Sequence, residues 1–458
     1  MFKMTANEIA QAVDGLLTGN GDIFITDIQY DSRAVKKGTL FAAIKGENVD
    51  GHQFIEDCFA KGAAAVFTEN DVPDDSTGCY IKVENTRLAL QKLAAYYRSK
   101  KNVRLIGITG SVGKTSTKEM VAAGLSKGFD VMKTQGNKNS QIGLPMTMFE
   151  IGENHEIAVI EMGMSEFGEM DRLADVARPN MAVMTNIGIA HIENLGTQEN
   201  ILKEKFRITK YFDKDGVLFL NGDDRLLRTL HGKQDFKTVT FGLDKDNDFH
   251  AEEIKAEGFN TKFVCCFDGN RVSLEIPALG EHSVKNALAA FAVGNYLGLD
   301  EKTIQEGLMT YKNAPMRQQI HEMKDFILVD DSYNSSPDAA KVSLNVLKSV
   351  SKGKSIAILA DMLELGEKAE NEHYGVGKHL ADIGIDILLT VGELSRHTAK
   401  GAEENGCRNV FSFENNSQAY EYLAKIIEKD CVVLVKGSRG MLTDEIVKKV
   451  LSDFENKI

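Results

Sequence analysis

Residues 103–115 constrain the fold of this chain most, because an apolar run is followed directly by a glycine-rich loop and a Lys-Thr pair. The apolar run 103–108 predicts a buried strand, and the spacing of apolar residues in 116–125 predicts an amphipathic helix. A loop between strand and helix directs backbone N–H groups at an anion, and the helix start adds positive potential. The pattern Gly110-x-x-Gly113-Lys114-Thr115 therefore favours a phosphate-binding loop, with Lys114 at the outer phosphates and Thr115 on magnesium.

The alternative for this loop is a plain strand-to-helix turn whose glycines supply positive φ. A complete P-loop has a further glycine where this chain has Ile108. The Lys-Thr pair at the expected helix start is what favours phosphate binding over a simple turn.

Bulk composition excludes several classes of protein. A length of 458 residues with 43% hydrophobic residues predicts two or three domains with real cores. The 54 basic and 67 acidic residues leave a net charge of −13, which argues against nucleic acid or an anionic membrane as the main partner. No run of about 18 apolar residues is present, so we expect no membrane insertion.

The six cysteines are scattered and form no C-x-x-C pair, so neither a zinc ribbon nor a disulfide framework is predicted. A reducing cytoplasm is the expected location. We expect a monomer.

The alternation of strand-like and helix-like segments predicts an α/β fold with three domains. Residues 1–98 form a small α/β domain. Residues 99–313 form a central P-loop-type domain with a mostly parallel sheet, to which 239–276 add an antiparallel edge. Residues 314–458 form a second doubly wound, Rossmann-like unit, entered through a proline-containing linker at 312–315.

Ligands of open parallel sheets bind at the carboxyl ends of the strands, so polar residues that end apolar runs are candidate site residues. Glu161 follows such a run and is either a magnesium ligand or a carboxylate that caps the next helix. His191 lies in the loop after another run, where a satisfied polar residue is the usual alternative. Lys205 lies in a charged helical segment and, on its own, would be a solvated surface lysine.

Two more polar loops lie at expected strand ends in the third domain. Residues 330–337 contain Asp331 and Asn334 and could bind a ligand, but Asp, Asn, Ser and Pro are also the residues of ordinary turns. Residues 436–440 place Lys436 and Arg439 among two glycines, which suits a phosphate or carboxylate, or else forms a solvated surface loop.

Taken together, these residues resemble the Mur ligases of peptidoglycan synthesis, and the resemblance extends along nearly the whole chain. The family's ATP loop also lacks the early glycine, so Thr109 to Thr115 match it. Further matching segments are Asp31-Ser32-Arg33, Asp50-Gly51-His52, 136–145, Asp330-Asp331-Ser332-Tyr333-Asn334, 361–366 and Lys436-Gly437-Ser438-Arg439.

The resemblance implies a ligase that uses ATP and two Mg²⁺ ions. It implies that UDP-N-acetylmuramoyl-tripeptide, bound by the first domain, is joined to D-alanyl-D-alanine through an acyl phosphate. Catalysis is assigned by resemblance to Lys114, His191 and Lys205. ATP contacts are assigned to Gly110, Ser111, Gly113, Lys114, Thr115, Ser116, Asn286, Arg317 and Asp331, with His282 beside Asn286 at the adenine. Metal contacts are assigned to Thr115, Glu161, His191 and Lys205, and substrate contacts to Ser32, Arg33, Asn137, Asn334 and Arg439.

In the family the lysine at position 205 is carbamylated, and a small residue and an acid follow it, where this chain has Phe206 and Arg207. Two other functions are considered. A folylpolyglutamate synthase shares the ligase scaffold but would not explain the first domain or the 330–334 motif. A P-loop protein that uses ATP for a binding switch would not need a second metal pair at His191 and Lys205.

Overall fold

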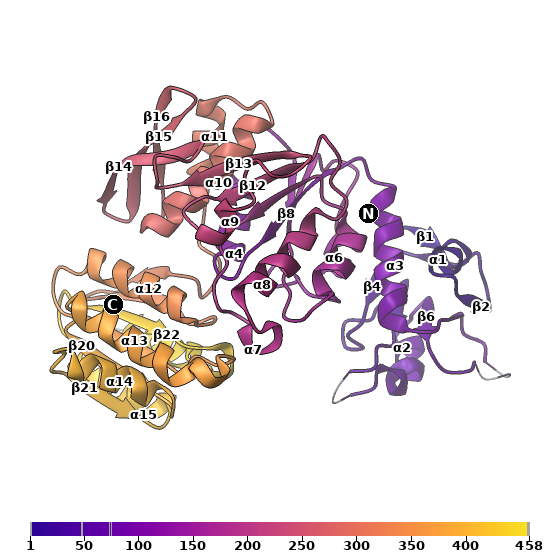
Figure 1. The fold of residues 1–458 in the computed structure, drawn as a ribbon. Helices are drawn as coiled ribbons and strands as arrows, with labels where there is room; N and C mark the ends of the chain where they lie inside the picture. Colours follow the sequence, from indigo (N-terminus) through magenta and orange to yellow (C-terminus); the bar gives the residue numbers. More distant parts are fainter. Residues whose placement is uncertain (1, 47–48, 73, 75, 456–458) are drawn as a thin grey trace.

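The computed structural model describes residues 2–46, 49–72, 74 and 76–455. Three separate α/β units follow one another along the chain, each built on its own main sheet, and Figure 1 shows the central unit between the other two. The predicted α/β class with three domains is confirmed. No helix in the described part of the chain is long and apolar enough to cross a membrane.

The first unit is a five-stranded sheet in the order β2-β7-β6-β5-β4, with a small β1-β3 pair beside it. Only β2 runs antiparallel to its neighbour in the main sheet. The elements are β1 (Met4–Thr5), α1 (Ala6–Val13), β2 (Leu16–Thr18), β3 (Phe24–Ile25), β4 (Asp27–Gln29), β5 (Thr39–Ala42), η1 (Gly51–Phe54), α2 (Ile55–Ala60), β6 (Ala65–Thr68), β7 (Tyr80–Lys82) and α3 (Thr86–Ser99).

Helix α3 joins the first unit to the second. Tyr97 Oη donates a hydrogen bond to the carbonyl of Ile151 at 3.0 Å, and Arg98 Nε donates to the carbonyl of Ala177 at 2.9 Å. The rings of Phe2, Tyr97 and Phe149 also pack against one another. Apolar and polar contacts together therefore fix this helix against the central unit.

The central unit is a nine-stranded sheet in the order β16-β15-β14-β13-β12-β11-β8-β10-β9. Its elements are β8 (Arg104–Thr109), α4 (Lys114–Leu125), β9 (Val131–Lys133), α5 (Gly143–Met148), β10 (Ile157–Glu161), α6 (Glu169–Ala177), β11 (Met181–Met184), α7 (Ile192–Leu195), α8 (Gln198–Phe206), η2 (Arg207–Thr209), β12 (Val217–Asn221), α9 (Arg225–Arg228), β13 (Lys237–Gly242), β14 (Phe249–Glu257), β15 (Asn260–Phe267), β16 (Asn270–Ile276), α10 (Glu281–Tyr296) and α11 (Glu301–Leu308).

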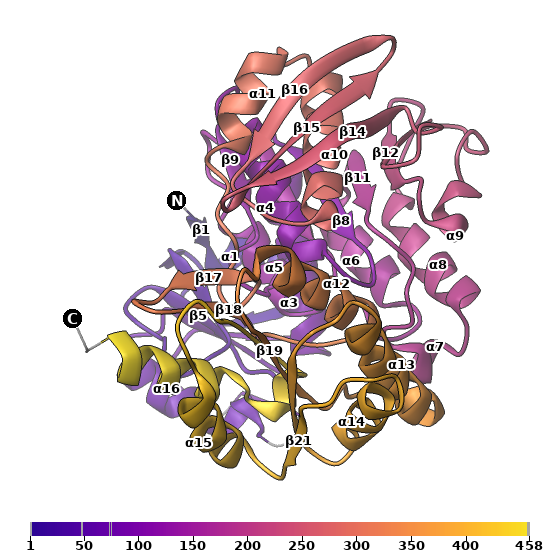
Figure 2. The same ribbon diagram turned by 90° about the vertical axis from the view of Figure 1, so that its left-hand side faces the viewer.

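Two details of this sheet differ from the sequence-based expectation. Antiparallel pairing begins between β14 and β15 rather than near residue 239, because β13 pairs in parallel with both β12 and β14. Helix α4 is buried on most of its surface rather than amphipathic, since α10 and α11 cover the side that faces away from the sheet. Figure 2 shows β14, β15 and β16 together at the outer edge of the sheet.

The third unit is a six-stranded sheet in the order β17-β18-β22-β19-β20-β21, parallel except for the edge strand β17. Its elements are β17 (Gln319–Glu322), β18 (Ile327–Asp331), α12 (Pro337–Val350), β19 (Ser355–Ala360), η3 (Gly366–Lys368), α13 (Ala369–Asp382), β20 (Ile387–Val391), α14 (Ser395–Glu404), β21 (Val410–Phe413), α15 (Asn416–Ile426), β22 (Val432–Lys436), η4 (Arg439–Met441) and α16 (Asp444–Glu455).

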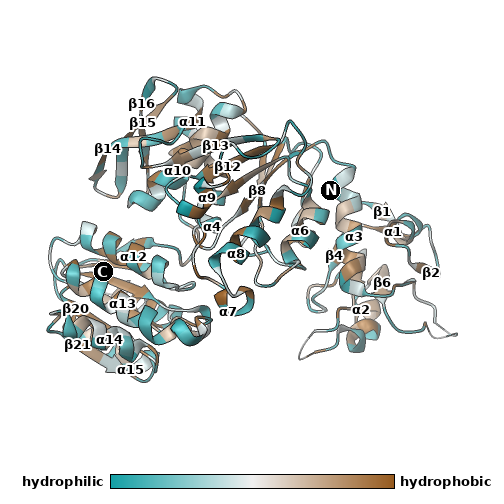
Figure 3. Cartoon of the chain, in the orientation of Figure 1, coloured by the Kyte–Doolittle hydropathy of each residue, from teal (hydrophilic) through white to brown (hydrophobic). Residues whose placement is uncertain are grey.

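Successive side chains along the central strands point to opposite faces of the sheet and so contribute to two separate hydrophobic cores. Ile106, Val159 and Phe219 belong to the core under α4 and α10, whereas Leu105 and Ile160 belong to the core on the other face. Figure 3 shows the corresponding pattern in the third unit, with hydrophobic strands under largely hydrophilic helices.

The parallel register brings the carboxyl ends of β8, β10 and β11 to one edge of the sheet. Glu161 pairs with Ile108, and Met184 pairs with Thr109. The loops that follow these three strands are therefore neighbours, which is the geometry expected of a binding site.

Candidate active site

Two adjoining cavities lie between the second and third units. The loop cavity, of about 310 Å³, is lined by residues 111–116, Glu161, His191 and the loops that follow β18, β19 and β22. The helix cavity, of about 230 Å³, is lined by residues of α10, α12 and the ends of β12, β18 and β22. Val112, Gly113, Ser116, Arg317 and Ala339 line both. The two cavities therefore adjoin at the glycine-rich loop and together form one site.

The glycine-rich loop is held in place by the segment that follows β11. Ser111 N–H donates to the carbonyl of Asn186 at 3.0 Å, and Val112 N–H donates to Asn186 Oδ1 at 2.8 Å. Thr185 Oγ1 donates to the carbonyl of Val112 at 2.6 Å. A Cβ atom on Gly110 would lie 1.9 Å from Thr185 Oγ1, so this close approach requires glycine.

The start of α4 lies at the loop cavity. Gly113 has φ of 84° and precedes the helix, which begins at Lys114. The first amides of a helix have no partner within it, so those of Lys114, Thr115 and Ser116 are free of intrahelical bonds and favour an anion. Thr115 and Ser116 both line the loop cavity.

Lys114 folds back over its own loop. Its Nζ donates to the carbonyl of Gly110 at 2.9 Å and to that of Ser111 at 3.4 Å. Burial lowers the pKa of this ammonium, Glu161 opposes the shift, and Arg317 adds to it. A bound anion would therefore relieve an environment that is unfavourable to the charge of the lysine.

Glu161 ends β10 as a buried carboxylate, 2% exposed. Asn139 Nδ2 donates to Glu161 Oε1 at 2.6 Å, while Oε2 is buried with no hydrogen-bond partner. A buried anionic oxygen that lacks a donor is costly unless a cation or another donor meets it. This orphaned oxygen fits the predicted magnesium ligand better than a helix cap. Asn137 lies exposed at the rim of the same cavity.

His191 adopts a left-handed conformation, φ 62°, immediately before α7 and lines the loop cavity. Its Nδ1 lies 3.3 Å from Glu364 Oε2, which makes an ion pair between the second and third units when the ring is protonated. Burial lowers the pKa of the imidazole, and Lys114 and Lys205 lower it further, against Glu364 and Glu169. A neutral ring is the form that ligates a metal ion.

Lys205 lies in α8 and is 1% exposed, so it is not the surface lysine that its charged neighbours alone would suggest. Burial, with Lys114 as a second cause, lowers the pKa of its amine well below the ordinary value. The two lysines and His191 thus influence one another electrostatically. Lys205 itself does not line either cavity. After it, Phe206 stacks on Phe236 and Arg207 lies 3.7 Å from Asp171.

The helix cavity contains side chains that bond one another. Asn286 Oδ1 accepts a hydrogen bond from Thr117 Oγ1 at 2.7 Å, and His282 Nε2 lies 2.9 Å from Gln318 Oε1. Burial lowers the pKa of His282 to about 4, so the ring is neutral at pH 7. Because Gln318 Oε1 can only accept a hydrogen bond, the neutral ring of His282 carries its proton on Nε2 and donates it there.

Asp331 ends β18 as one partner of a buried ion pair. Lys436 Nζ donates to Asp331 Oδ2 at 2.6 Å, with side-chain exposures of 3% and 8%. Ser343 Oγ donates to the same oxygen, and Gln318 N–H donates to Oδ1 at 3.2 Å. The carboxylate thus ties together β18, β22, α12 and the 315–318 loop. It lines the helix cavity with most of its hydrogen-bonding capacity already used.

Arg317, Asn334 and Arg439 gather around Tyr333 at the mouth of the loop cavity. The guanidinium of Arg317 lies 4.2 Å from the centre of the Tyr333 ring, and that of Arg439 lies 5.9 Å from it. Arg439 N–H donates to Asn334 Oδ1 at 3.3 Å. Two cations held beside a tyrosine ring suit an anionic ligand.

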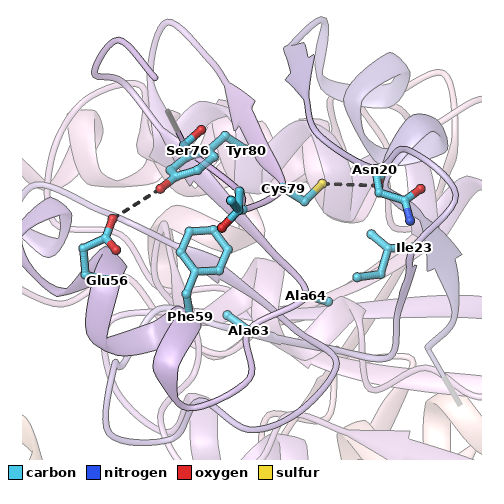
Figure 4. Close-up of a pocket in the computed structure, with 11 residues that line it drawn as sticks. Asn20, Ile23, Glu56, Phe59, Ala63, Ala64, Ser76, Cys79 and Tyr80 are labelled. Atoms are coloured by element: carbon cyan, nitrogen blue, oxygen red, sulfur yellow. Dashed lines mark hydrogen bonds between the residues drawn. The ribbon is translucent and has the colours of Figure 1, made fainter. Parts of the chain in front are cut away.

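Ser32 and Arg33 are not brought to these cavities. Arg33 is exposed and pairs with Asp31 at 2.7 Å, which lowers the pKa of that carboxyl to about 2. The first unit has a hollow of its own, of about 580 Å³, shown in Figure 4 with Tyr80 Oη bonded to Glu56 at 3.3 Å. Neither Ser32 nor Arg33 lines it.

Three features of the site were missed in the sequence. Asn186 braces the loop, Asn139 meets Glu161, and Lys436 neutralises Asp331. Asn139 and Lys436 stood inside segments that match the family, and Asn186 stood in the loop before His191, but their partners are distant in sequence. A polar residue at a strand end was the available signal, and it did not identify the partner.

Comparison with known proteins agrees with this geometry. Family models match in three stretches: "Mur ligase family, catalytic domain" at 24–98, "Mur ligase middle domain" at 108–294 and "Mur ligase, glutamate ligase domain" at 316–439. A UDP-N-acetylmuramoyl-tripeptide–D-alanyl-D-alanine ligase from Bacillus subtilis is 36% identical over 457 residues, covering 98% of this chain and 99% of the relative.

Solved structures of MurF ligases are similar to this chain over nearly its whole length. The crystal structure of MurF from Acinetobacter baumannii has a TM-score of 0.92 at 28% identity, covering 99% of this chain and 100% of that one. The MurF ligase from Thermotoga maritima, in complex with ADP, has a TM-score of 0.84 at 27% identity, covering 94% of this chain and 98% of that one.

Proposed function

Because this chain belongs to the Mur ligase family, we propose that it joins D-alanyl-D-alanine to the terminal carboxylate of UDP-N-acetylmuramoyl-tripeptide, with conversion of ATP to ADP and phosphate. The observation that carries this proposal is the 36% identity, over 98% of the chain, to a ligase of that name. The ADP complex of the related Thermotoga maritima ligase supports ATP as the energy source.

The reaction has two steps. A carboxylate oxygen of the tripeptide attacks the γ-phosphorus, the bond from that phosphorus to the β-γ bridging oxygen breaks, and ADP leaves. The amine of the dipeptide then attacks the acyl carbon, phosphate leaves with the C–O bond electrons, and the nitrogen loses a proton. Both reactants of the first step are anions, so the site must offset their repulsion.

The glycine-rich loop and the start of α4 supply most of that offset from the protein. We assign the phosphates to the amides after Gly113 and to Lys114, which exchanges its bonds to loop carbonyls for bonds to phosphate oxygens. In the third unit Arg317 and Arg439, beside Tyr333, lie where outer phosphate or substrate carboxylate charge would be met.

The residues present fit Mg²⁺. Glu161 has a buried oxygen without a donor, and Thr115 and His191 line the same cavity. Mg²⁺ held by these residues would neutralise phosphate charge and polarise the phosphoryl oxygens. Burial lowers the pKa of Lys205 and so favours the free amine, which is the form that combines with carbon dioxide. As a carbamate, Lys205 would supply an anionic oxygen to the second metal set.

We assign the adenosine to the helix cavity, with Asn286 and His282 at the base and Asp331 at the ribose. Asn137, Asn334 and Arg439 are assigned to the peptide end of the substrate, and Ser32 and Arg33 to the UDP end. Since both cavities lie between two units, approach of the third unit would exclude water from the acyl phosphate. Glu364 already contacts His191 across that boundary.

The proposal is tested by ADP release from the purified enzyme. Release should require both the UDP-linked tripeptide and D-alanyl-D-alanine, with ADP, phosphate and amide formed in equal amounts, and single D-alanine should be a poor acceptor. Assay of the lysine and the diaminopimelate tripeptides identifies the third residue. ADP release by ATP alone, or better turnover of a folate with glutamate, would contradict the assignment.

The carbamate is tested separately by chemical rescue. Lys205→Ala should lose activity, and acetate or propionate should restore part of it by placing an anion in the vacated space. A Lys205→Ala protein with full activity in carbon-dioxide-free buffer would remove the carbamate from the mechanism.

We further propose a monomer that works in the cytoplasm. All six cysteines are buried free thiols, which suits a reducing compartment. Light scattering from the purified protein should give the mass of one chain. A stable dimer at working concentration would overturn the monomer.

A further inference from the structure

Three metal-binding side chains meet on the hairpin of β14 and β15, away from the two cavities of the proposed active site. His250, Glu252 and Cys266 offer one ligand atom each, and these atoms all lie within 4.8 Å of one another. In the described part of the chain no other group of three His, Cys, Asp or Glu residues meets this criterion. His250 pairs directly with Cys266, and Glu252 follows two residues later on the same face.

We propose that His250, Glu252 and Cys266 form a Zn²⁺ site with a water molecule as the fourth ligand. Imidazole nitrogen, carboxylate oxygen and thiolate sulfur are the ligands of zinc, whereas Mg²⁺ prefers oxygen alone. Ligand atoms around tetrahedral zinc are about 3.5 Å apart, so small side-chain rotations close this group around an ion. The site does not depend on the proposed ligase activity.

The surroundings of His250 and Cys266 favour ligation. His250 Nδ1 lies 3.4 Å from the carbonyl of Asn247, and donation to that carbonyl leaves Nε2 as the free ligand atom. Cys266 is 7% exposed, and Arg271 Nη1 lies 3.5 Å from its sulfur. Zinc binds cysteine as the thiolate, so ligation displaces the thiol proton of Cys266 to solvent.

Glu252 already has two cationic partners, which the ion must partly replace. Lys245 lies 2.7 Å from one carboxylate oxygen and Arg271 lies 2.6 Å from the other. Both cations are more than half exposed, at 78% and 52%, so water can solvate them, and Arg271 keeps Glu253 at 2.9 Å. The thiolate and the carboxylate together balance the charge of Zn²⁺.

The position is also open to an ion from solvent. His250, Glu252 and Cys266 line a surface hollow of about 800 Å³ at the edge of the central sheet. The strand pairing shifts between Glu252 and Lys255, where Glu253 has φ of 54°, so the strand bends directly beside the site. Such irregularities at a sheet edge redirect side chains.

Cobalt titration of the full-length, reduced protein tests the site, with Mg²⁺ in excess to occupy sites of oxygen ligands. One equivalent of Co²⁺ should produce the near-ultraviolet absorption of a cobalt–thiolate bond, and Zn²⁺ should abolish it. Cys266→Ser should remove the band, and His250→Ala should weaken Zn²⁺ binding by about 100-fold or more. Neither variant should change the circular dichroism spectrum.

Cys265→Ala is the matched control, because the neighbouring thiol is fully buried and points to the opposite face of the hairpin. It should keep the band and the affinity for Zn²⁺. Cys407→Ala is a second control should the first disturb folding. Absence of a thiolate band in the parent protein, or its persistence in Cys266→Ser, would overturn the proposal.

Discussion

The two cavities of the candidate active site differ in how their polar side chains are paired. In the helix cavity, Asp331 is bonded to Lys436 and Ser343, and His282 is bonded to Gln318. In the loop cavity, the side chain of Lys114 donates to carbonyls of its own loop, and Glu161 has a buried oxygen with no donor among the described residues. The helix cavity is therefore maintained by internal pairing, whereas the loop cavity holds charge in readiness for a ligand.

This difference separates stability from catalysis. Substitutions in the helix cavity should change the free energy of unfolding, because they leave a buried partner unpaired. Substitutions of the loop-cavity groups that we assign to phosphate or metal should change turnover and leave the fold intact. Four experiments test this contrast.

The largest effect is expected from Lys436→Met. It leaves the Asp331 carboxylate buried without its cation, which should lower the free energy of unfolding by about 3–5 kcal/mol. Chemical denaturation measures the loss. The double variant Asp331→Asn, Lys436→Met should recover part of it, and a double variant as unstable as the single one would show that the pair is not the cause.

Lys114→Ala should reduce kcat/KM by about 100- to 1,000-fold, equivalent to about 2.7–4 kcal/mol, because a charge contact to the transferring phosphate is lost. Its denaturation midpoint should match that of the parent protein, since Lys114 is at the cavity surface and removes no core volume. Near-normal activity, or a large loss of stability, would break the distinction between the two cavities.

His282 should make stability depend on pH by about 1–3 kcal/mol. Its pKa is about 4 in the folded protein and about 6.5 when unfolded, so the unfolded chain binds more protons between these values. The contribution is fully present above about pH 6.5 and is lost as pH falls toward 4. Chemical denaturation at a series of pH values measures this, and the free energy of unfolding of His282→Gln should vary less with pH over this window than that of the parent protein. Identical curves would contradict the prediction.

The smallest effect is expected from Glu364→Gln, which removes the partly exposed ion pair with His191. Pairs of this kind contribute about 0–1 kcal/mol, so stability and turnover should change little. Steady-state kinetics and denaturation both measure this. A large loss of activity would show that the contact between His191 and Glu364 contributes to catalysis and is more than a weak surface ion pair.

The sequence predicted those parts of the fold that depend on local pattern. The run 103–108 became β8, and the helix predicted over 116–125 lies within α4, because the spacing of apolar residues distinguishes a strand from a helix. The direction of β13 was not predictable in this way, since a short strand reads the same in parallel and antiparallel pairing. The short edge strand β17 went unnoticed for a similar reason.

The site was predictable as a set of motifs and not as a set of contacts. Lys114, Thr115, Glu161 and His191 line one cavity, as their positions at strand ends suggested. The burial of Lys205 was hidden by its charged neighbours in sequence. Pairing of Asp331 with Lys436, and the meeting of Cys266 with His250, join residues that only the folded sheets bring together.

The brace on the glycine-rich loop also bears on how the chain acquires its activity during synthesis. The loop at 110–113 takes its shape from Thr185 and Asn186, and that segment is in turn held by Asn221 and Asp224 through hydrogen bonds of 2.8 and 2.7 Å. Contacts so far apart in sequence form only after the intervening helices and strands have been made and placed. A nascent chain that has emerged only as far as α4 therefore has the nucleotide motif but not its geometry, and competence to bind phosphate arrives about a hundred residues after the motif has left the ribosome.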